Sequence, residues 1–285
     1  MKRFLLPLFC LASSSFAVEL TGDFKGPFGL QLYSLRETFK TNPTDALDKT
    51  KTYGFPIAEL YSGMPVETEK LKTELAARGI TAISSHFGYD ALKKDLAGAV
   101  KTAQSLGLKY AGVAWIPHQV AEFGEADVKR AAADFQEFGK AFKAAGIQFF
   151  YHVHGYEFRP VAEGATDTFF DLLARATDPE LVAFEMDVFW VVHPGADPVK
   201  LLQKYPGRWA LMHLKDIAKT ARTGVYTGKA PLTDDVPLGT GQVPWPAVLK
   251  QAAASGVKYY FIEDESPTVL EAIPVSIQYL QTIKF

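Results

Sequence analysis

Side chains that bind divalent metals stand at the ends of four apolar segments in the second half of the chain. They are His152 and His154 after residues 149–151, Asp187 after 182–186, His213 after 209–212, and Glu263 after 259–262. Imidazole and carboxylate ligands without sulfur suit Mn²⁺, Co²⁺, Zn²⁺ or Mg²⁺ rather than a structural cysteine-type zinc site. One such histidine is ordinarily structural, but several buried carboxylates are costly unless a shared cation satisfies them. The pattern therefore predicts one divalent cation where these segments end.

The segments that must position these side chains repeat along the chain. Five times a helix-like stretch meets a glycine and then an apolar strand, at Gly54, Gly79, Gly107, Gly146 and Gly256. Glycine is the usual stop after a helix because it adopts positive φ freely. The predicted strands are residues 28–33, 56–60, 81–86, 109–115, 147–153, 181–187, 208–213 and 258–263. Eight strands alternating with helices predict a single-domain (β/α)8 TIM barrel, whose active site lies at the carboxyl ends of the strands.

Composition and loop length narrow the function. The net charge is −2, and no basic tract is present. Nucleic acid and anionic membrane surfaces are therefore not expected as partners. No G-x-G-x-x-G follows the first strand, which argues against a dinucleotide fold. Residues 217–244 show no helical pattern and include Arg222, and a connection of that length predicts a lid or binding loop.

The N-terminus has the layout of a secretory signal peptide. Lys2 and Arg3 precede a short apolar run, and small residues lead to Ala17. We expect cleavage after residue 17, a linker at 18–26 and the barrel at 27–285, with the mature protein periplasmic or secreted and not held in a membrane. The only cysteine, Cys10, would leave with the signal, which excludes disulfides and thiolate catalysis in the mature chain.

Several motifs together resemble the xylose isomerase-like TIM barrels known as sugar phosphate isomerases/epimerases. They are H-V-H-G-Y-E-F at 152–158, D-V-F-W at 187–190, G-A-D-P at 195–198, H-L-K-D at 213–216, G-T-G at 239–241 with Trp245, and Glu263 on the last strand. The motifs occur in the order of that family across residues 28–285. The resemblance is specific for the superfamily and not for the substrate.

The resemblance implies a metal-ligand set. Ketose epimerases of this superfamily bind their metal through Glu, Asp, His and Glu from strands five to eight. Asp187, His213 and Glu263 match the last three, whereas His152 stands where a glutamate is usual. His154 is the alternative ligand from the fifth strand. The missing carboxylate puts in question a mechanism in which two glutamates exchange the substrate proton.

The implied activity is a metal-dependent sugar isomerase or epimerase that works through an enediolate. Glu157 and Glu263 are the predicted proton-transfer groups, with His154 and Lys215 assisting catalysis. The predicted substrate-binding residues are Glu59, His86, Trp115, Trp190 and Arg222, and Phe87 could also stack on a sugar ring. Export and the absence of a phosphate-binding loop favour a non-phosphorylated sugar or keto-sugar. Two alternatives stay open: a 3-keto-glycoside lyase or deglycosylase on the same barrel, and a non-catalytic carbohydrate-binding barrel.

Overall fold

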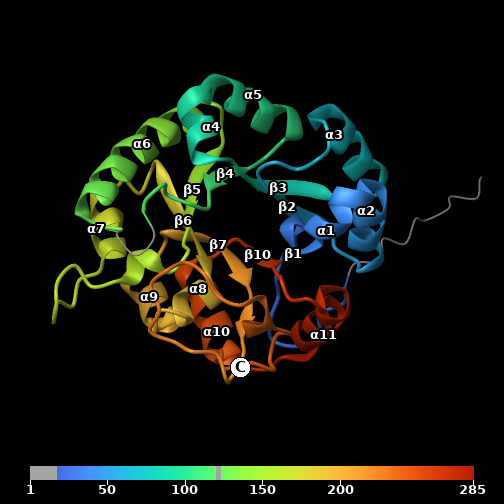
Figure 1. Cartoon of the computed structure of the whole chain (residues 1–285). Coiled ribbons are helices and arrows are strands. Elements are labelled where there is room, and N and C mark those ends of the chain that lie inside the picture. Colours follow the sequence, from blue (N-terminus) through green and yellow to red (C-terminus); the bar gives the residue numbers. More distant parts are fainter. Residues whose placement is uncertain (1–17, 120–122) are drawn as a thin grey trace, which may run out of the picture.

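Eight parallel strands close into a barrel in the computed structural model, which describes residues 18–119 and 123–285. The barrel strands are β1 (Phe28–Gln31), β2 (Ile57–Leu60), β3 (Thr81–His86), β4 (Tyr110–Val113), β5 (Gln148–His152), β6 (Val182–Asp187), β7 (Trp209–Leu214) and β10 (Tyr259–Ile262). Each strand pairs with its neighbours in the chain, and β1 closes the circle by pairing with β10 (Figure 1). The predicted (β/α)8 barrel is confirmed. The predicted signal peptide lies outside the described residues.

Helices surround the strands in an outer ring (Figure 1). They are α1 (Arg36–Thr41), α2 (Pro43–Thr52), α3 (Thr68–Ala77), α4 (Tyr89–Lys94), α5 (Leu96–Leu106), α6 (Glu125–Ala144), α7 (Phe169–Ala176), α8 (Val188–Val192), α9 (Pro198–Lys204), α10 (Trp245–Ser255) and α11 (Val269–Thr282). Short 3-10 turns are η1 (Leu32–Leu35), η2 (Tyr156–Phe158) and η3 (Leu232–Asp234). None of the described helices has the length and apolar character needed to cross a membrane.

Apolar side chains at helical spacing hold α6 against the barrel. Val128, Phe135, Phe138 and Phe142 are all buried, and Phe135 and Phe138 both pack on the ring of Phe149 in β5. α10 and α5 end as the sequence predicts, on Gly256 and Gly107, at φ of 90° and 70°. Such turns let each helix return directly to the next strand, so the strand ends stay on one rim.

The barrel interior has an apolar lower layer. It consists of Ile83, Phe150, Ala183, Leu211 and Phe261, one from each of five strands. Side chains two residues further along a strand point the same way. The residues directly above this layer are therefore those at the site, including His152 above Phe150 and His213 above Leu211.

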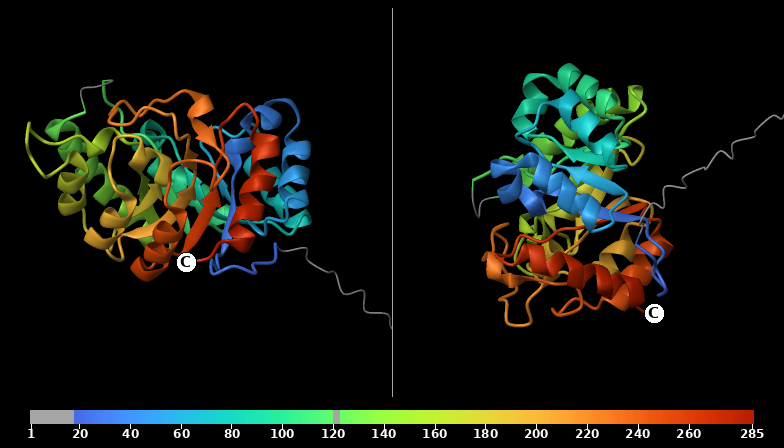
Figure 2. Two further views of the ribbon diagram at one scale, coloured as in Figure 1. Left: turned by 90° about the horizontal axis from the view of Figure 1, so that it is seen from below. Right: turned by 90° about the vertical axis from the view of Figure 1, so that its right-hand side faces the viewer.

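The predicted linker, residues 18–26, is packed against the C-terminal end of the chain. The backbone N–H groups of Thr21 and Asp23 donate to the carbonyls of Gln281 and Ile283, at 2.9 and 2.8 Å. Phe24 is buried. Figure 2 shows this N-terminal stretch running beside the C-terminus. The segment is therefore part of the barrel's outer packing rather than a free tether.

The long connection after β7 is tied down at both ends. β8 (Asp216–Ile217) pairs antiparallel with β9 (Asp235–Val236). The carboxylate of Asp216 accepts hydrogen bonds from the backbone of Gly239, Gly241 and Val243 and from the indole of Trp245. A Cβ on Gly241 would lie 2.2 Å from Asp216 Oδ1, so only glycine fits there. This connection, predicted to be a lid or binding loop, is anchored by these contacts, and we refer to it as the strap.

Candidate metal and sugar site

Three predicted ligands converge at the carboxyl rim. Asp187 ends β6, His213 lies directly opposite it on β7, and Glu263 follows β10. His213 Nδ1 is 3.0 Å from Glu263 Oε2 and 3.8 Å from Asp187 Oδ2. Donor atoms of these three buried residues all lie within 4.8 Å of one another. One divalent cation would fit among them.

Asp187 gives the clearest sign that this group fits a metal. Its Oδ1 accepts the backbone N–H of Trp190 at 3.1 Å and so caps α8. Its Oδ2 is buried without a hydrogen-bond partner. A buried carboxylate oxygen without a partner costs free energy that a bound cation would offset. The donor set of imidazole and carboxylate suits the divalent metals predicted above.

His152 takes part from the fifth strand, although less closely. Its Nε2 is 3.9 Å from Asp187 Oδ2. Its Nδ1 is 3.0 Å from Glu185 Oε2, inside the barrel. His152 therefore stands between the rim group and a second, deeper set that combines His86, His152, Glu185 and His213.

The deeper set contains Glu185, which our sequence reasoning missed. It is fully buried on β6, two residues before Asp187. Its Oε2 lies 2.9 Å from His86 Nε2, and its Oε1 lies 3.3 Å from His213 Nε2. Strand alternation was the available signal, because Glu185 shares the inward parity of Asp187.

Glu59, predicted as a substrate-binding residue, lies in the same deep layer. It is fully buried and is not among the described residues that line the pocket. Its carboxylate contacts His213 Nε2 at 2.6 Å and Gln31 Nε2 at 2.6 Å, and it also accepts from the Ser84 hydroxyl. Glu59 therefore contacts His213, an expected metal ligand, and its substrate-binding role stays a prediction.

Charge pairing in this layer fixes the ionisation of His86. Burial alone would lower the pKa of His86, but the carboxylates of Glu59 and Glu185 raise it to about 10. The imidazolium thus joins two buried carboxylates that would otherwise repel each other. His86 also lines the pocket, and its contact with a substrate stays a prediction.

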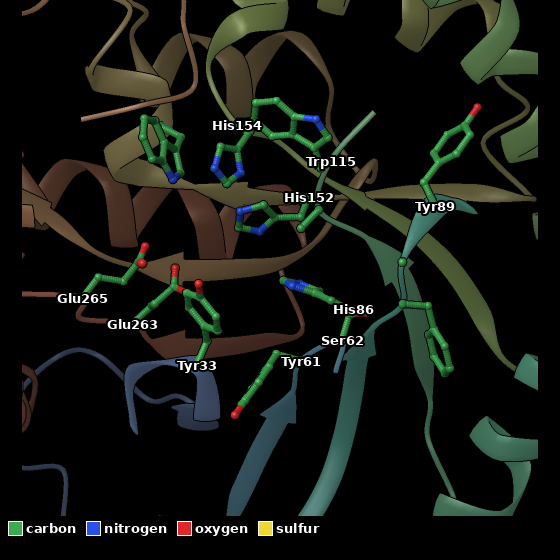
Figure 3. A pocket seen from close by; sticks show the side chains of 14 residues that line it. Tyr33, Tyr61, Ser62, His86, Tyr89, Trp115, His152, His154, Glu263 and Glu265 are labelled. Atoms are coloured by element: carbon green, nitrogen blue, oxygen red, sulfur yellow. The ribbon is translucent and has the colours of Figure 1, made fainter. Parts of the chain in front are cut away.

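A pocket of about 310 Å³ opens above the rim group (Figure 3). Six predicted residues line it: His86, Trp115, His152, His154, Trp190 and Glu263. Phe87 lines it as well, whereas Tyr33, Tyr61, Tyr89 and Glu265 were not predicted from the sequence. In Figure 3, His86 and His152 lie on one side and Glu263 and Glu265 on the other. Aromatic faces beside carboxylates and imidazoles suit a sugar ring with its hydroxyl groups.

His154 lies on the aromatic side of this pocket. Its ring stacks on Trp190 with centroids 4.6 Å apart, and Trp115 meets it edge-on at 5.3 Å. Burial holds the pKa of His154 well below its usual range. His154 is therefore neutral. It belongs to neither donor group formed by the described residues, so His152 is the better placed ligand from β5.

Glu157, predicted as a proton-transfer group, lies behind the described lining of the pocket, and that role stays a prediction. It is fully buried in η2, and its Oε1 accepts from the backbone N–H of His154 at 2.8 Å and from the Tyr151 hydroxyl at 2.9 Å. It is not among the described residues that line the pocket. Burial raises the pKa of Glu157 to about 7. Its contacts hold the turn that carries His154.

Lys215 forms an ion pair with Glu263 on the side of this carboxylate that faces away from the pocket. Its ammonium lies 2.5 Å from Glu265 Oε1, 3.4 Å from Glu263 Oε2 and 3.6 Å from Asp235 Oδ2. Burial alone would raise the pKa of Glu263, but the charges of Lys215 and His213 hold it well below the usual range. Glu263 is thus a carboxylate. Lys215 itself is buried and is not one of the described residues that line the pocket.

Arg222 is exposed on the strap that follows β8, and it too is absent from the described lining of the pocket. Its substrate contact stays a prediction. The strap instead contributes Asp235, which approaches Lys215 and accepts the backbone N–H of Glu265 at 2.7 Å.

Fold and site together define a single-domain (β/α)8 barrel with a metal-type donor set at its carboxyl rim. A family model described as xylose isomerase-like TIM barrel matches residues 47–283, and the chain belongs to that family.

One relative in sequence and two solved structures show which proteins the chain is similar to. Inosose dehydratase 2 of Bacillus cereus is 26% identical over 216 residues, which cover 69% of this chain and 70% of the relative. The crystal structure of a sugar phosphate isomerase/epimerase from Parabacteroides distasonis superposes with a TM-score of 0.75 at 24% identity, covering 97% of this chain and 98% of the other. The crystal structure of the IolI protein with a bound zinc atom has a TM-score of 0.66 at 15% identity, covering 90% and 98%.

Proposed function

We propose that this protein is a divalent-metal enzyme that removes a proton next to the carbonyl group of a non-phosphorylated sugar or keto-sugar, as sugar isomerases and epimerases do. The observation that carries the proposal is the unpartnered Oδ2 of Asp187, buried beside His213 and Glu263 below an aromatic pocket. Asp187, His213, Glu263 and His152 would hold the metal. A cation bound there would supply Lewis-acid stabilisation of the negative charge that develops on the substrate oxygens.

The residues around the pocket have separable tasks. Glu263 is ionised and reaches the pocket, so it is the candidate base. Lys215 holds it in place from the strap side. Trp115, Trp190 and neutral His154 form the wall on which a sugar ring would stack, and the charged imidazolium of His86 would donate to a sugar hydroxyl.

Elimination from a keto-sugar or keto-glycoside is the second candidate, and the departure at His152 favours it. Epimerisation by two carboxylates needs one on each face of the reacting carbon, whereas here the fifth strand presents an imidazole. Elimination needs one base to take the C–H proton and a proton donor for the departing hydroxyl or alkoxide. The relative named inosose dehydratase agrees with this alternative.

One experiment tests the proposal and separates the two outcomes. Free sugars, keto-sugars and keto-glycosides are incubated in D₂O with Mn²⁺-loaded protein. Solvent deuterium at a carbon next to the carbonyl supports proton abstraction. An epimer or isomer then identifies the first candidate, and an unsaturated product identifies the second. Sugar binding without exchange or product would contradict the proposal and favour a non-catalytic carbohydrate-binding barrel.

We further propose that the chain is exported. The basis is the charged start, apolar run and small residues ending at Ala17. Protein isolated from the native host should begin at or near Val18. Cytoplasmic protein that still begins at Met1 would contradict this.

A further inference from the structure

Two buried carboxylates lie behind the two histidines of the proposed metal site. His213 faces Glu263 and Asp187 with Nδ1 and faces Glu59 Oε1 with Nε2, at 2.6 Å. His152 faces Asp187 with Nε2 and Glu185 Oε2 with Nδ1, at 3.0 Å. Each imidazole thus has one nitrogen toward the rim and the other toward an interior carboxylate.

We infer that Glu59 and Glu185 are positioning residues that hold His213 and His152 in the orientation and tautomer needed to bind the metal. This inference rests on the proposed metal site and adds residues that contact neither metal nor substrate. A histidine ligand binds through a nitrogen without a proton, so its other nitrogen carries the proton. An interior carboxylate that accepts this N–H fixes which nitrogen remains free. The arrangement assigns Nδ1 of His213 and Nε2 of His152 to the metal.

Glu59 is held on both of its carboxylate oxygens, whereas Glu185 is held through Oε2 and its Oε1 has no hydrogen-bond partner. Glu59 accepts from Gln31 Nε2 at 2.6 Å and from the Ser84 hydroxyl. His86 Nε2 lies 3.2 Å from Glu59 and 2.9 Å from Glu185, so it links the two carboxylates. Both glutamates are fully buried, which leaves them without solvent as a competing partner. Rigid carboxylates of this kind restrict the rotation of the imidazoles in front of them.

The test compares Glu59→Gln and Glu185→Gln with the unmodified chain by calorimetric titration with Zn²⁺. Each substitution keeps the side-chain volume but removes the charge. We expect metal affinity to fall about 10- to 100-fold, the range usual for such outer partners. Asp171→Asn is the matched control, because Asp171 is a buried carboxylate in α7 that contacts Lys204 and Tyr205 instead of the site. Its metal affinity should not change.

A spectroscopic readout separates positioning from a general loss of structure. In Zn²⁺-loaded protein with ¹⁵N-labelled histidine, His213 should carry its proton on Nε2 and His152 on Nδ1. Should both glutamine variants fold poorly, Ser84→Ala removes one donor to Glu59 and should weaken metal binding by a smaller factor.

Three results would overturn the inference. One is unchanged metal affinity in the folded variants, and another is protons on the opposite ring nitrogens. The third is two metal ions per unmodified chain falling to one in Glu185→Gln, because the deep set would then itself be a metal site. Absence of any metal binding by the unmodified chain would instead reject the proposed function.

Discussion

The lower and upper layers of the barrel interior differ sharply although the same strands build both. In the lower layer, Phe150, Ala183, Leu211 and Phe261 fill the space with apolar groups. Two residues further along the same strands, the side chains become His152, Glu185, His213 and Glu263, all buried and ionisable. Burial therefore stabilises the apolar lower layer, whereas in the upper layer it costs free energy unless the charged groups are paired. The fold is held together by the first layer, and the chemistry depends on the second.

The largest expected effect is the loss of metal binding and turnover when one metal-ligating side chain of the upper layer is replaced. Asp187→Asn replaces the unpartnered Oδ2 with a weaker ligand while an amide oxygen can still cap α8. We expect metal binding and turnover to be lost, a larger effect than any change to an outer partner. Elemental analysis of Mn²⁺-loaded protein measures the metal. Equal metal content in this variant and the unmodified chain would contradict the assigned site, and His213→Ala should behave as Asp187→Asn does.

A substitution in the lower layer should lower the free energy of unfolding and leave metal binding unchanged. Leu211 is fully buried directly below His213, and Leu211→Ala leaves a cavity between aromatic neighbours. The free energy of unfolding should fall by about 2–5 kcal/mol, as for other buried leucines. Metal content per folded chain should stay the same. Urea unfolding and elemental analysis give the two values, and a stable variant that loses its metal would show that the layers are not separable in this way.

The two layers also differ in how far the sequence predicted them. Glycine stops and apolar strands predicted the barrel, since both depend on neighbours in the chain. Asp187, His213 and Glu263 were predicted to meet because strand ends share a rim. Burial was harder to predict: Glu59 and Glu157 were expected at the substrate, yet both are enclosed. Which polar residues reach the pocket depends on depth along the barrel axis, and that depends on strand stagger.

The strap is a second region whose contacts could not be predicted from the sequence. A long segment without helical pattern predicted a lid or binding loop that carries Arg222. The structure shows the segment fixed through Asp216, whose carboxylate accepts hydrogen bonds from four backbone N–H groups and one indole. In the sequence, Asp216 stands out only as the last residue of the H-L-K-D motif. Contacts between residues more than twenty positions apart, such as Asp216 with Trp245, leave no local pattern in the sequence.

The smallest expected effect concerns Glu157, which, unlike the paired acids of the upper layer, is buried without a charged partner. Burial raises its pKa from 4.5 to about 7 in the folded protein. Between these pH values the folded chain keeps a proton that the unfolded chain has lost. Stability from this residue is therefore present below pH 4.5 and is lost as the pH rises toward 7, by at most about 3 kcal/mol.

The Glu157→Gln variant tests this pH dependence. Its side chain cannot ionise, so its free energy of unfolding should rise relative to that of the unmodified chain as the pH increases across this range. Urea unfolding of both proteins at several pH values between 4.5 and 7.5 measures the difference. A difference that does not change with pH would mean that Glu157 is ionised in the folded protein and that the turn carrying His154 is held by a charge.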